Sequence, residues 1–216
     1  MTAGYGGRGK HMRKLIVGAG TVLILAAFVL GRLSAQSPAT APAPSCNMCP
    51  AELISAEELA AYEAIAIARN LVDQQVRSID IGKANVQIAL VRRRVLDAPA
   101  PRSVAEHSLV TEVYYILSGS GTNVTGPDLI DRQQRPPDNA AVQRLNGPGS
   151  NSVGIRNGET QELEAGDVLV IPAGTGHQFT RIDDHITYLM VRVDPDKVVP
   201  LMDAADSAAY LSANRP

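Results

Sequence analysis

Apolar and polar positions alternate with a period of two over most of the chain beyond residue 75. Short runs rich in Val, Ile and Leu are separated by Gly, Pro, Asn and Asp, a pattern typical of half-buried strands joined by turns. The predicted strands cover residues 76–81, 85–95, 104–108, 111–117, 121–125, 152–156, 160–164, 168–172, 177–182 and 185–193. Many short strands with turn residues between them predict an all-β fold, either a sandwich or a small antiparallel barrel.

The N-terminal pattern is different. Basic residues up to Lys14 precede an uninterrupted apolar run over residues 15–30, and small residues end at Ala35, which is the order of a signal peptide. At about 1.5 Å per residue this run spans roughly 24 Å, short of the about 30 Å hydrocarbon core, so cleavage after Ala35 is favoured. Leu33 is bulky for a cleavage site, so an uncleaved anchor crossing at residues 15–30 stays open. Both alternatives place the remainder outside the cytoplasm: periplasmic, secreted, or anchored and facing the periplasm.

Two short segments connect this N-terminus to the strands. Residues 36–54 are rich in Pro, Ala and Ser, a composition that does not bury enough surface to order a chain and predicts a tether. Its Cys46 and Cys49 are the only cysteines of the protein, and in an oxidising compartment they favour a short-range disulfide. The Ser55-x-x-Glu58 pattern then predicts a capping box and a helix that packs on the strands.

The chain therefore divides into five parts. These are a signal peptide or anchor (1–35), the tether (36–54), a packing helix (55–75), the β domain (76–195), and a C-terminal tail with a short helix (196–216). Translation starts at Met1 or at Met12, since Met12-Arg13-Lys14 is itself a compact signal start.

Charge excludes one class of partner. The whole chain carries 20 basic and 22 acidic residues, and five of the basic ones lie within residues 1–35, which hold no acidic residue. The rest is therefore acidic and lacks the basic patch that displaces phosphate counterions, so nucleic acid is not expected as a partner.

Two segments carry the candidate chemistry. Residues 105–119 read AEHSLVTEVYYILSG, and residues 166–179 read GDVLVIPAGTGHQF. They resemble the two motifs of the cupin superfamily, G-x5-H-x-H-x(3,4)-E-x6-G and G-x5-P-x-G-x2-H-x3-N. The matching positions are Glu112, Gly119, Gly166, Pro172, Gly174 and His177, together with His107 as the second histidine of the H-x-H pair.

This resemblance implies a double-stranded β-helix, or jelly roll, over about residues 80–195, and a dimer. It also implies a metal site, but the sequence departs from the family pattern. Ala105 stands in place of the first histidine, Pro99 in place of the initial glycine, and Arg181 in place of the closing asparagine. The ligand set is thereby reduced to His107, Glu112 and His177.

Strand geometry adds to this interpretation. Residues 105 and 107 share one face of a strand, so both are expected to point into the barrel, with Glu106 outward. Glu112 has the opposite parity, so the chain must turn between His107 and Glu112, and His177 is expected to enter from the facing wall. Glu106 and His185 are the weaker alternatives for a replacement ligand.

Two imidazoles and one carboxylate with open positions suit one divalent metal. Iron is favoured, with manganese, nickel, copper or zinc as alternatives. Two functions from different classes remain open. The first is a metal-dependent enzyme with dioxygenase-like, isomerase or lyase chemistry on a small oxygen-bearing molecule, with Tyr114 as acid or base and residues 126–150 as a lid. The second is a non-catalytic small-molecule binding barrel with a vestigial metal site. Tyr114, Phe179, Tyr188 and Met190 are expected in the cavity or the core.

Overall fold

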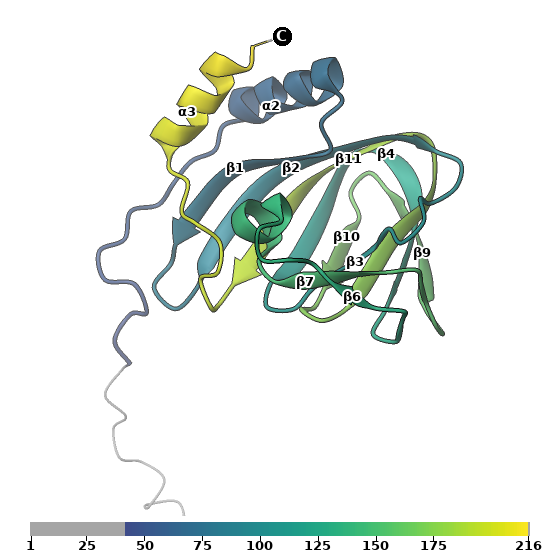
Figure 1. Ribbon diagram of the computed structural model, residues 1–216. Helices are drawn as coiled ribbons and strands as arrows, with labels where there is room; N and C mark the ends of the chain where they lie inside the picture. The colour runs from purple at the N-terminus through teal and green to yellow at the C-terminus, as the bar shows by residue number, and fades with distance from the viewer. Residues whose placement is uncertain (1–41, 216) are drawn as a thin grey trace, which may run out of the picture. The chain divides into compact units, whose positions relative to one another are not determined.

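The computed structural model describes residues 42–215 (Figure 1). The predicted signal peptide or anchor, with its apolar run at residues 15–30, lies outside the described residues. Among residues 42–215, no helix is long and apolar enough to cross a membrane.

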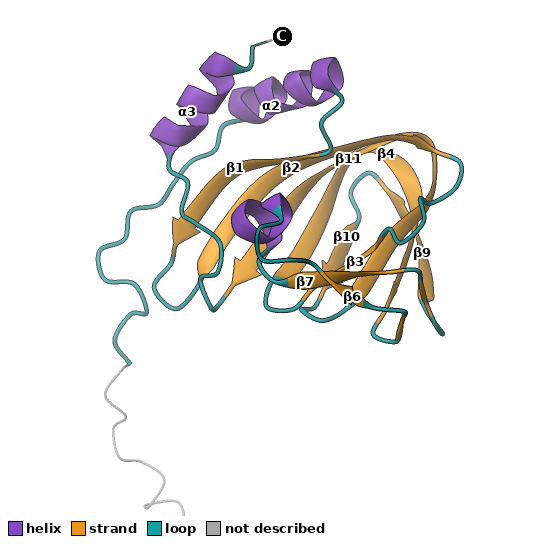
Figure 2. Cartoon of the chain, in the orientation of Figure 1, coloured by secondary structure: helices purple, strands orange, loops and turns teal. Residues whose placement is uncertain are grey.

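Antiparallel strands are the main secondary structure of the described chain (Figure 2). They are β1 (Asp73–Asp80), β2 (Asn85–Leu96), β3 (Val104–His107), β4 (Thr111–Gly126), β5 (Leu129–Ile130), β6 (Gln133–Gln134), β7 (Gly149–Ser152), β8 (Gly154–Ile155), β9 (Glu159–Glu164), β10 (Val168–Ile171) and β11 (Gly176–Asp194). The all-β, jelly-roll prediction is confirmed. Within residues 42–215 the strand pairings do not close into a complete ring, so the fold is an open double-stranded β-helix.

The strands form two facing layers. The two longest strands, β4 and β11, hold the fold together because each contributes one half to each layer (Figure 1). Their halves 111–119 and 186–193 pair with each other and lie between β10 and β2, with β1 beyond β2. Their other halves, 122–126 and 176–181, pair with each other and lie between β9 and β3, followed by β7 and β6.

At the corner between the two layers, the observed strand boundaries of β4 and β11 differ from the predicted ones. The sequence predicts breaks near residues 118–120 and 183–184, but both strands continue through the corner with shifts of register. Gly119 makes this possible, because its φ is +75° and a Cβ there would lie 1.9 Å from the carbonyl oxygen of His185. Bulged strands bend without ending, which explains why turn residues are a poor guide here.

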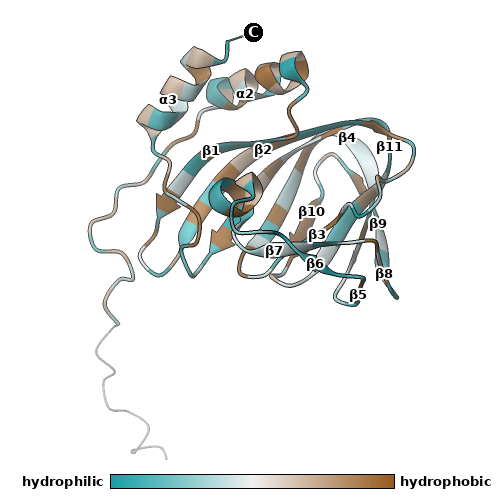
Figure 3. Ribbon diagram, viewed as in Figure 1, coloured by the Kyte–Doolittle hydropathy of each residue, from teal (hydrophilic) through white to brown (hydrophobic). Residues whose placement is uncertain are grey.

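The core lies between the layers. It is built from inward-facing residues of β2, β4, β10 and β11, with Leu163 of β9, and it includes Tyr114, Phe179, Tyr188 and Met190. Brown, hydrophobic segments alternate with teal ones along the strands in Figure 3, as expected for strands with one buried face. All four residues are buried in this core, and of the four Phe179 also lines a cavity.

Two helices, α2 (Ala56–Arg69) and α3 (Ala204–Ala213), pack together on the β1–β2 side of the sheet (Figure 1). Tyr62 stacks on Tyr210 with ring centroids 5.3 Å apart, and its hydroxyl bonds Ser207 at 2.9 Å. Ser55 caps α2 as predicted by accepting from the Glu58 backbone N–H. The reciprocal half of the predicted capping box is wrong, because the Glu58 carboxylate pairs with Arg77 instead.

The segment at residues 126–150 is not the structureless loop that its Pro and Gly content suggests. It holds β5, β6 and a short π-helix, η1 (Val142–Asn146). After η1, Gly147 has a φ of +64°, and the Pro148 carbonyl accepts from Ser108 N–H at 2.8 Å. The end of η1 is therefore fixed beside the end of β3.

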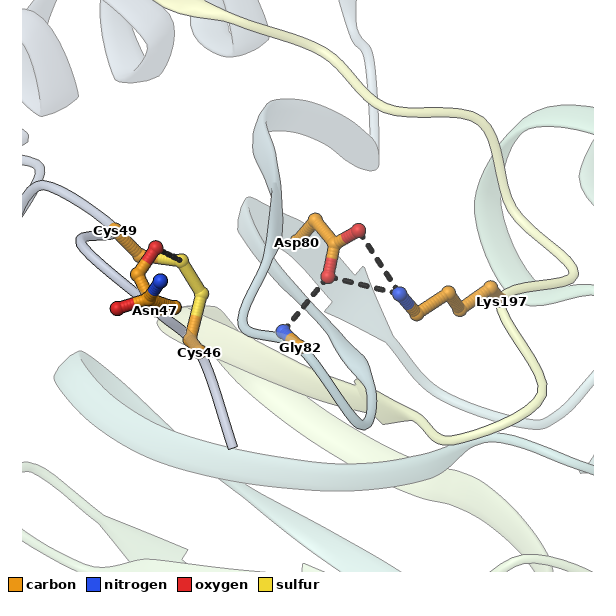
Figure 4. The surroundings of a disulfide bond; sticks show 6 residues. All are labelled: Cys46, Asn47, Cys49, Asp80, Gly82 and Lys197. Atoms are coloured by element: carbon orange, nitrogen blue, oxygen red, sulfur yellow. Dashed lines mark hydrogen bonds and ion pairs between the residues drawn. A yellow bond between two sulfur atoms is a disulfide. The ribbon is translucent and has the colours of Figure 1, made fainter. Parts of the chain in front are cut away.

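Cys46 and Cys49 are joined by a disulfide, near the β1–β2 hairpin (Figure 4). In this hairpin Asp80 accepts from the Gly82 N–H and pairs with Lys197. A Cβ on Gly82 would lie 1.9 Å from the carbonyl oxygen of Ser45, so the segment just before the disulfide is packed closely on the hairpin.

Candidate metal centre

Three residues from two distant motifs meet inside the fold. His107 ends β3, Glu112 begins β4, and His177 begins β11, and one ligand atom from each lies within 4.8 Å of the others. All three side chains are buried. The Glu112 carboxylate lies between the rings, with Oε1 3.3 Å from His107 Nε2 and Oε2 3.5 Å from His177 Nε2.

Backbone contacts place these side chains. The chain turns between His107 and Glu112 as predicted, since β3 ends at 107 and β4 begins at 111. The Pro172–Thr175 turn contains Gly174, with a φ of +84°, and the Gly174 N–H donates to the His107 carbonyl at 2.8 Å. The second motif is thus tied directly to the first.

The expectation that His177 enters from the facing wall holds relative to Glu112 but not relative to His107. Residues 176–181 of β11 lie in the layer opposite residues 111–119 of β4, whereas His177 pairs with Ala105 on β3 and so lies on a strand directly beside β3. The sequence pattern does not reveal that β11 runs between β3 and β4.

His177 has the arrangement usual for a metal ligand. Its Nδ1 lies 3.3 Å from the Thr175 carbonyl oxygen, which fixes the proton on Nδ1 and leaves the Nε2 lone pair facing Glu112. Metal-binding histidines commonly donate the second ring N–H to such an acceptor. Burial lowers the pKa of His177, so its ring is neutral near pH 7.

His107 is held differently. Its Nδ1 lies 3.5 Å from the Arg135 guanidinium, and its Nε2 lies 3.0 Å from the Asn146 side-chain amide. Burial lowers the pKa of His107 to about 3, against the opposing effect of Glu112. The ring is therefore neutral as well, which is the form that binds metal.

Glu112 has a buried cationic partner. Arg192, fully buried at 0% exposure, places Nε 3.1 Å from Glu112 Oε1 and also pairs with Asp73. Burial alone would raise the pKa of Glu112, but His107 and Arg192 outweigh it and lower the pKa to about 2. A buried carboxylate needs a nearby positive charge, and Arg192 supplies one without a metal.

Tyr114 completes the surroundings of the carboxylate by donating its hydroxyl to Glu112 Oε2 at 2.9 Å. Burial, followed by the nearby carboxylate, raises the pKa of Tyr114 well above its ordinary value. Tyr114 is therefore a fixed hydrogen-bond donor that orients Glu112.

The two alternative ligands lie elsewhere. Glu106 was expected to face outward, but it is 1% exposed and accepts from Arg132 at 2.8 Å and from Ser150 at 2.6 Å. It points away from the cluster and is covered by residues of the 126–150 segment. His185 pairs with Asp184 at 2.7 Å. Neither belongs to the cluster of potential ligands.

A cavity of about 210 Å³ opens beside the cluster. It reaches His177 and Ala105, the position of the missing histidine, and its other lining residues include Arg93, Ser103, Gln178 and Phe179. The Arg93 guanidinium lies 5.3 Å from the Phe179 ring centroid and donates to Tyr188 at 3.1 Å. The cavity therefore combines an apolar ring with a fixed positive charge.

The donor set fits a divalent metal. Ligand atoms at about 2.1 Å from one ion, at angles of about 90–109°, lie roughly 3.0–3.4 Å apart, which is close to the two His–Glu separations. Sequence reasoning missed three neighbours of the cluster: Arg135, Asn146 and Arg192. Of the three, only Arg192 could have been recognised from the sequence, because it is a charged residue on the same strand face as the apolar Tyr188 and Met190.

Comparisons with known proteins concern the fold. The sequence profile of the AraC-like ligand binding domain family matches residues 155–214, a stretch that includes His177 but not His107 or Glu112. No curated protein matches the chain. The motifs, the strand topology and the profile match together support the cupin superfamily.

Solved structures similar to the chain include three bacterial or archaeal proteins. One is from Bacillus halodurans, at 15% identity over 73% of this chain and 90% of that one, with a TM-score of 0.38. A cupin protein from Bacteroides fragilis has 21% identity over 54% and 72%, with a TM-score of 0.32. An RmlC-like cupin family protein from Methanocaldococcus jannaschii has 14% identity over 58% and 85%, with a TM-score of 0.33.

Proposed function

We propose that this protein is an exported cupin-type domain that binds one divalent metal ion through His107, Glu112 and His177, and a small oxygen-bearing molecule in the adjoining cavity. The observation that carries the proposal is the convergence of three potential ligand atoms, from two motifs, within 4.8 Å in a buried site. Export rests on the signal-like pattern of residues 1–35.

The donor set favours iron. Two imidazoles and one carboxylate leave open positions for a substrate, and a bound ion supplies Lewis-acid polarisation of a substrate oxygen. The protein's part is to hold the carboxylate with Tyr114 and Arg192 and to keep both imidazoles neutral. Dioxygenase-like, isomerase and lyase reactions all suit this arrangement.

The cavity indicates the class of ligand. At about 210 Å³ it is smaller than typical drug-sized pockets, and Arg93 gives it a positive charge. A small carboxylate or other oxygen-rich anion fits these features.

A second candidate function is a metal-free binding domain for the same kind of molecule. It is favoured by the Arg192–Glu112 ion pair and by Arg135, a donor where a metal-bound histidine usually has an acceptor. The description of the matching profile, an AraC-like ligand binding domain, supports binding without catalysis.

Elemental analysis separates the two functions. The protein is purified anaerobically without chelator, as wild type and as His107→Ala, His177→Ala and His185→Ala variants. We expect about one equivalent of metal in the wild type and in His185→Ala, whose ring lies outside the cluster, and its loss in the other two. No stoichiometric metal after incubation with each of Fe, Mn, Ni, Cu and Zn would reject the metal-dependent function in favour of the metal-free one.

A further inference from the structure

Asn146 contacts two of the three potential ligands, His107 and Glu112. It is the last residue of η1 and is 6% exposed. We infer that Asn146 is the fourth protein ligand of the metal, through its side-chain oxygen, and so replaces the histidine that Ala105 lacks. This inference rests on the proposed metal-binding function.

Distances support this assignment. The Asn146 amide nitrogen lies 3.0 Å from His107 Nε2 and 3.2 Å from Glu112 Oε1. These separations match those expected between neighbouring ligand atoms around one ion, about 3.0–3.4 Å. A side chain at this place either coordinates the ion together with His107 and Glu112 or blocks the ion from reaching them.

The chemistry of the amide allows coordination. A half-turn about the Cβ–Cγ bond exchanges Nδ2 and Oδ1 at nearly the same positions. In the arrangement of this structure an N–H group donates to Glu112 Oε1, whereas after the half-turn the carbonyl oxygen would face the ion. Carbonyl oxygen is a hard ligand, so the set of two His, one Glu and one Asn favours Fe(II) or Mn(II) over a structural Zn(II) site.

The surrounding backbone holds Asn146 in place. Gly147 turns the chain at a φ of +64°, and a Cβ there would lie 2.4 Å from Val198. The next residue, Pro148, accepts from Ser108 just beyond the end of β3. Asn146 is therefore bound into the same corner as His107, with little freedom to leave the site.

Replacing a ligand at Ala105 by one from η1 has a further consequence. Ala105 lines the cavity together with His177, so the side where the missing histidine would stand is open to small molecules. Asn146 closes the cluster from the 126–150 segment. The protein thus keeps a fourth ligand while leaving the Ala105 side to a substrate.

The test is the affinity for Mn(II) and Co(II), measured by competition with a chelator, in the full chain and its variants. We expect Asn146→Ala to bind about 10- to 100-fold more weakly and Asn146→Asp at least as tightly as the wild type, because a carboxylate retains the oxygen ligand. Asn139→Ala is the control, since Asn139 accepts from Ala141 N–H at 2.9 Å, within the same segment but outside the cluster.

Co(II) absorption gives a second readout, because loss of one ligand changes the visible spectrum of the bound ion. Equal or tighter binding by Asn146→Ala, with an unchanged spectrum, would overturn the inference and identify Asn146 as a hydrogen-bonded block. That outcome leaves the metal function intact, whereas a wild type that binds neither ion overturns both. Circular dichroism of each variant confirms that the fold is retained.

Discussion

Substitution of Arg192 by Met tests the buried charge pair at the centre of the site. Arg192 is fully buried, and its Nε lies 3.1 Å from a Glu112 carboxylate that is 1% exposed. At an effective dielectric constant of about 20, two charges at this distance attract by roughly 5 kcal/mol. Without Arg192, the carboxylate keeps hydrogen bonds from Tyr114 and Asn146 only.

The cost of losing Arg192 is limited, because Glu112 can take up a proton instead of remaining charged. The ordinary pKa of glutamate is 4.5, so pH 7 lies about 2.5 pH units above it. At about 1.4 kcal/mol per pH unit, protonating Glu112 at pH 7 costs roughly 3 kcal/mol. We therefore expect Arg192→Met to lower the free energy of unfolding of the metal-free protein by about 3 kcal/mol at pH 7. The loss should shrink as the pH falls toward 4.5, where Glu112 is protonated in the folded variant and increasingly so in its unfolded chain.

Urea denaturation at pH 7 and pH 5, with chelator present, measures this. Arg192→Met is compared with Glu112→Gln and with the double variant, which should be less destabilised than the sum of the two single variants. Asp73→Asn is the control for the second partner of Arg192. A loss below 1 kcal/mol, or a loss of the same size at both pH values, would show that the charge pair does not carry the effect.

Two further predictions concern the fold. The metal-free protein should lose stability as the pH falls from 6.5 toward about 3, because the unfolded chain binds a proton on His107 that the folded chain does not bind. The expected loss is about 1.4 kcal/mol of unfolding free energy per pH unit. Urea denaturation at several pH values measures this, and the same pH dependence in His107→Gln would contradict it. Gly119→Ala should cost at least about 2 kcal/mol, because the new Cβ meets the His185 carbonyl. Gly166→Ala is the control, because Gly166 has a φ of +97° but open space around it, and it should cost only about 1 kcal/mol. Thermal unfolding measures both variants. Equal losses in Gly119→Ala and Gly166→Ala would rule out crowding at the corner.

Local sequence patterns predicted most of the strands and the helix cap at Ser55, whereas the resemblance to the cupin motifs supplied the three potential ligands. The spacing of Gly166, Pro172 and Gly174 works because it encodes a turn whose geometry is local. Alternation also placed His107 and Glu112 correctly on either side of a turn.

Features that depend on distant parts of the chain were not predicted. Asn146 reaches the site only because Gly147 and Pro148 bring η1 to the end of β3, a contact between segments about 40 residues apart. Glu106 is buried because Arg132 covers it, which strand parity alone does not show. The strand order that places His177 beside Ala105 is likewise a property of the whole sheet.

The bend in β11 restricts how the length of this chain can change. His177 and Phe179 are buried before the corner, whereas Tyr188, Met190 and Arg192 are buried after it, so odd-numbered residues face inward on one side and even-numbered residues on the other. The register shift between Phe179 and Arg181 accounts for this change, since Ile182 is already buried in the core. Deletion of one residue there would turn toward solvent either the half of β11 that carries His177 or the half that carries Arg192. Related sequences should therefore change length at this corner only by two residues, or together with a matching change in β4.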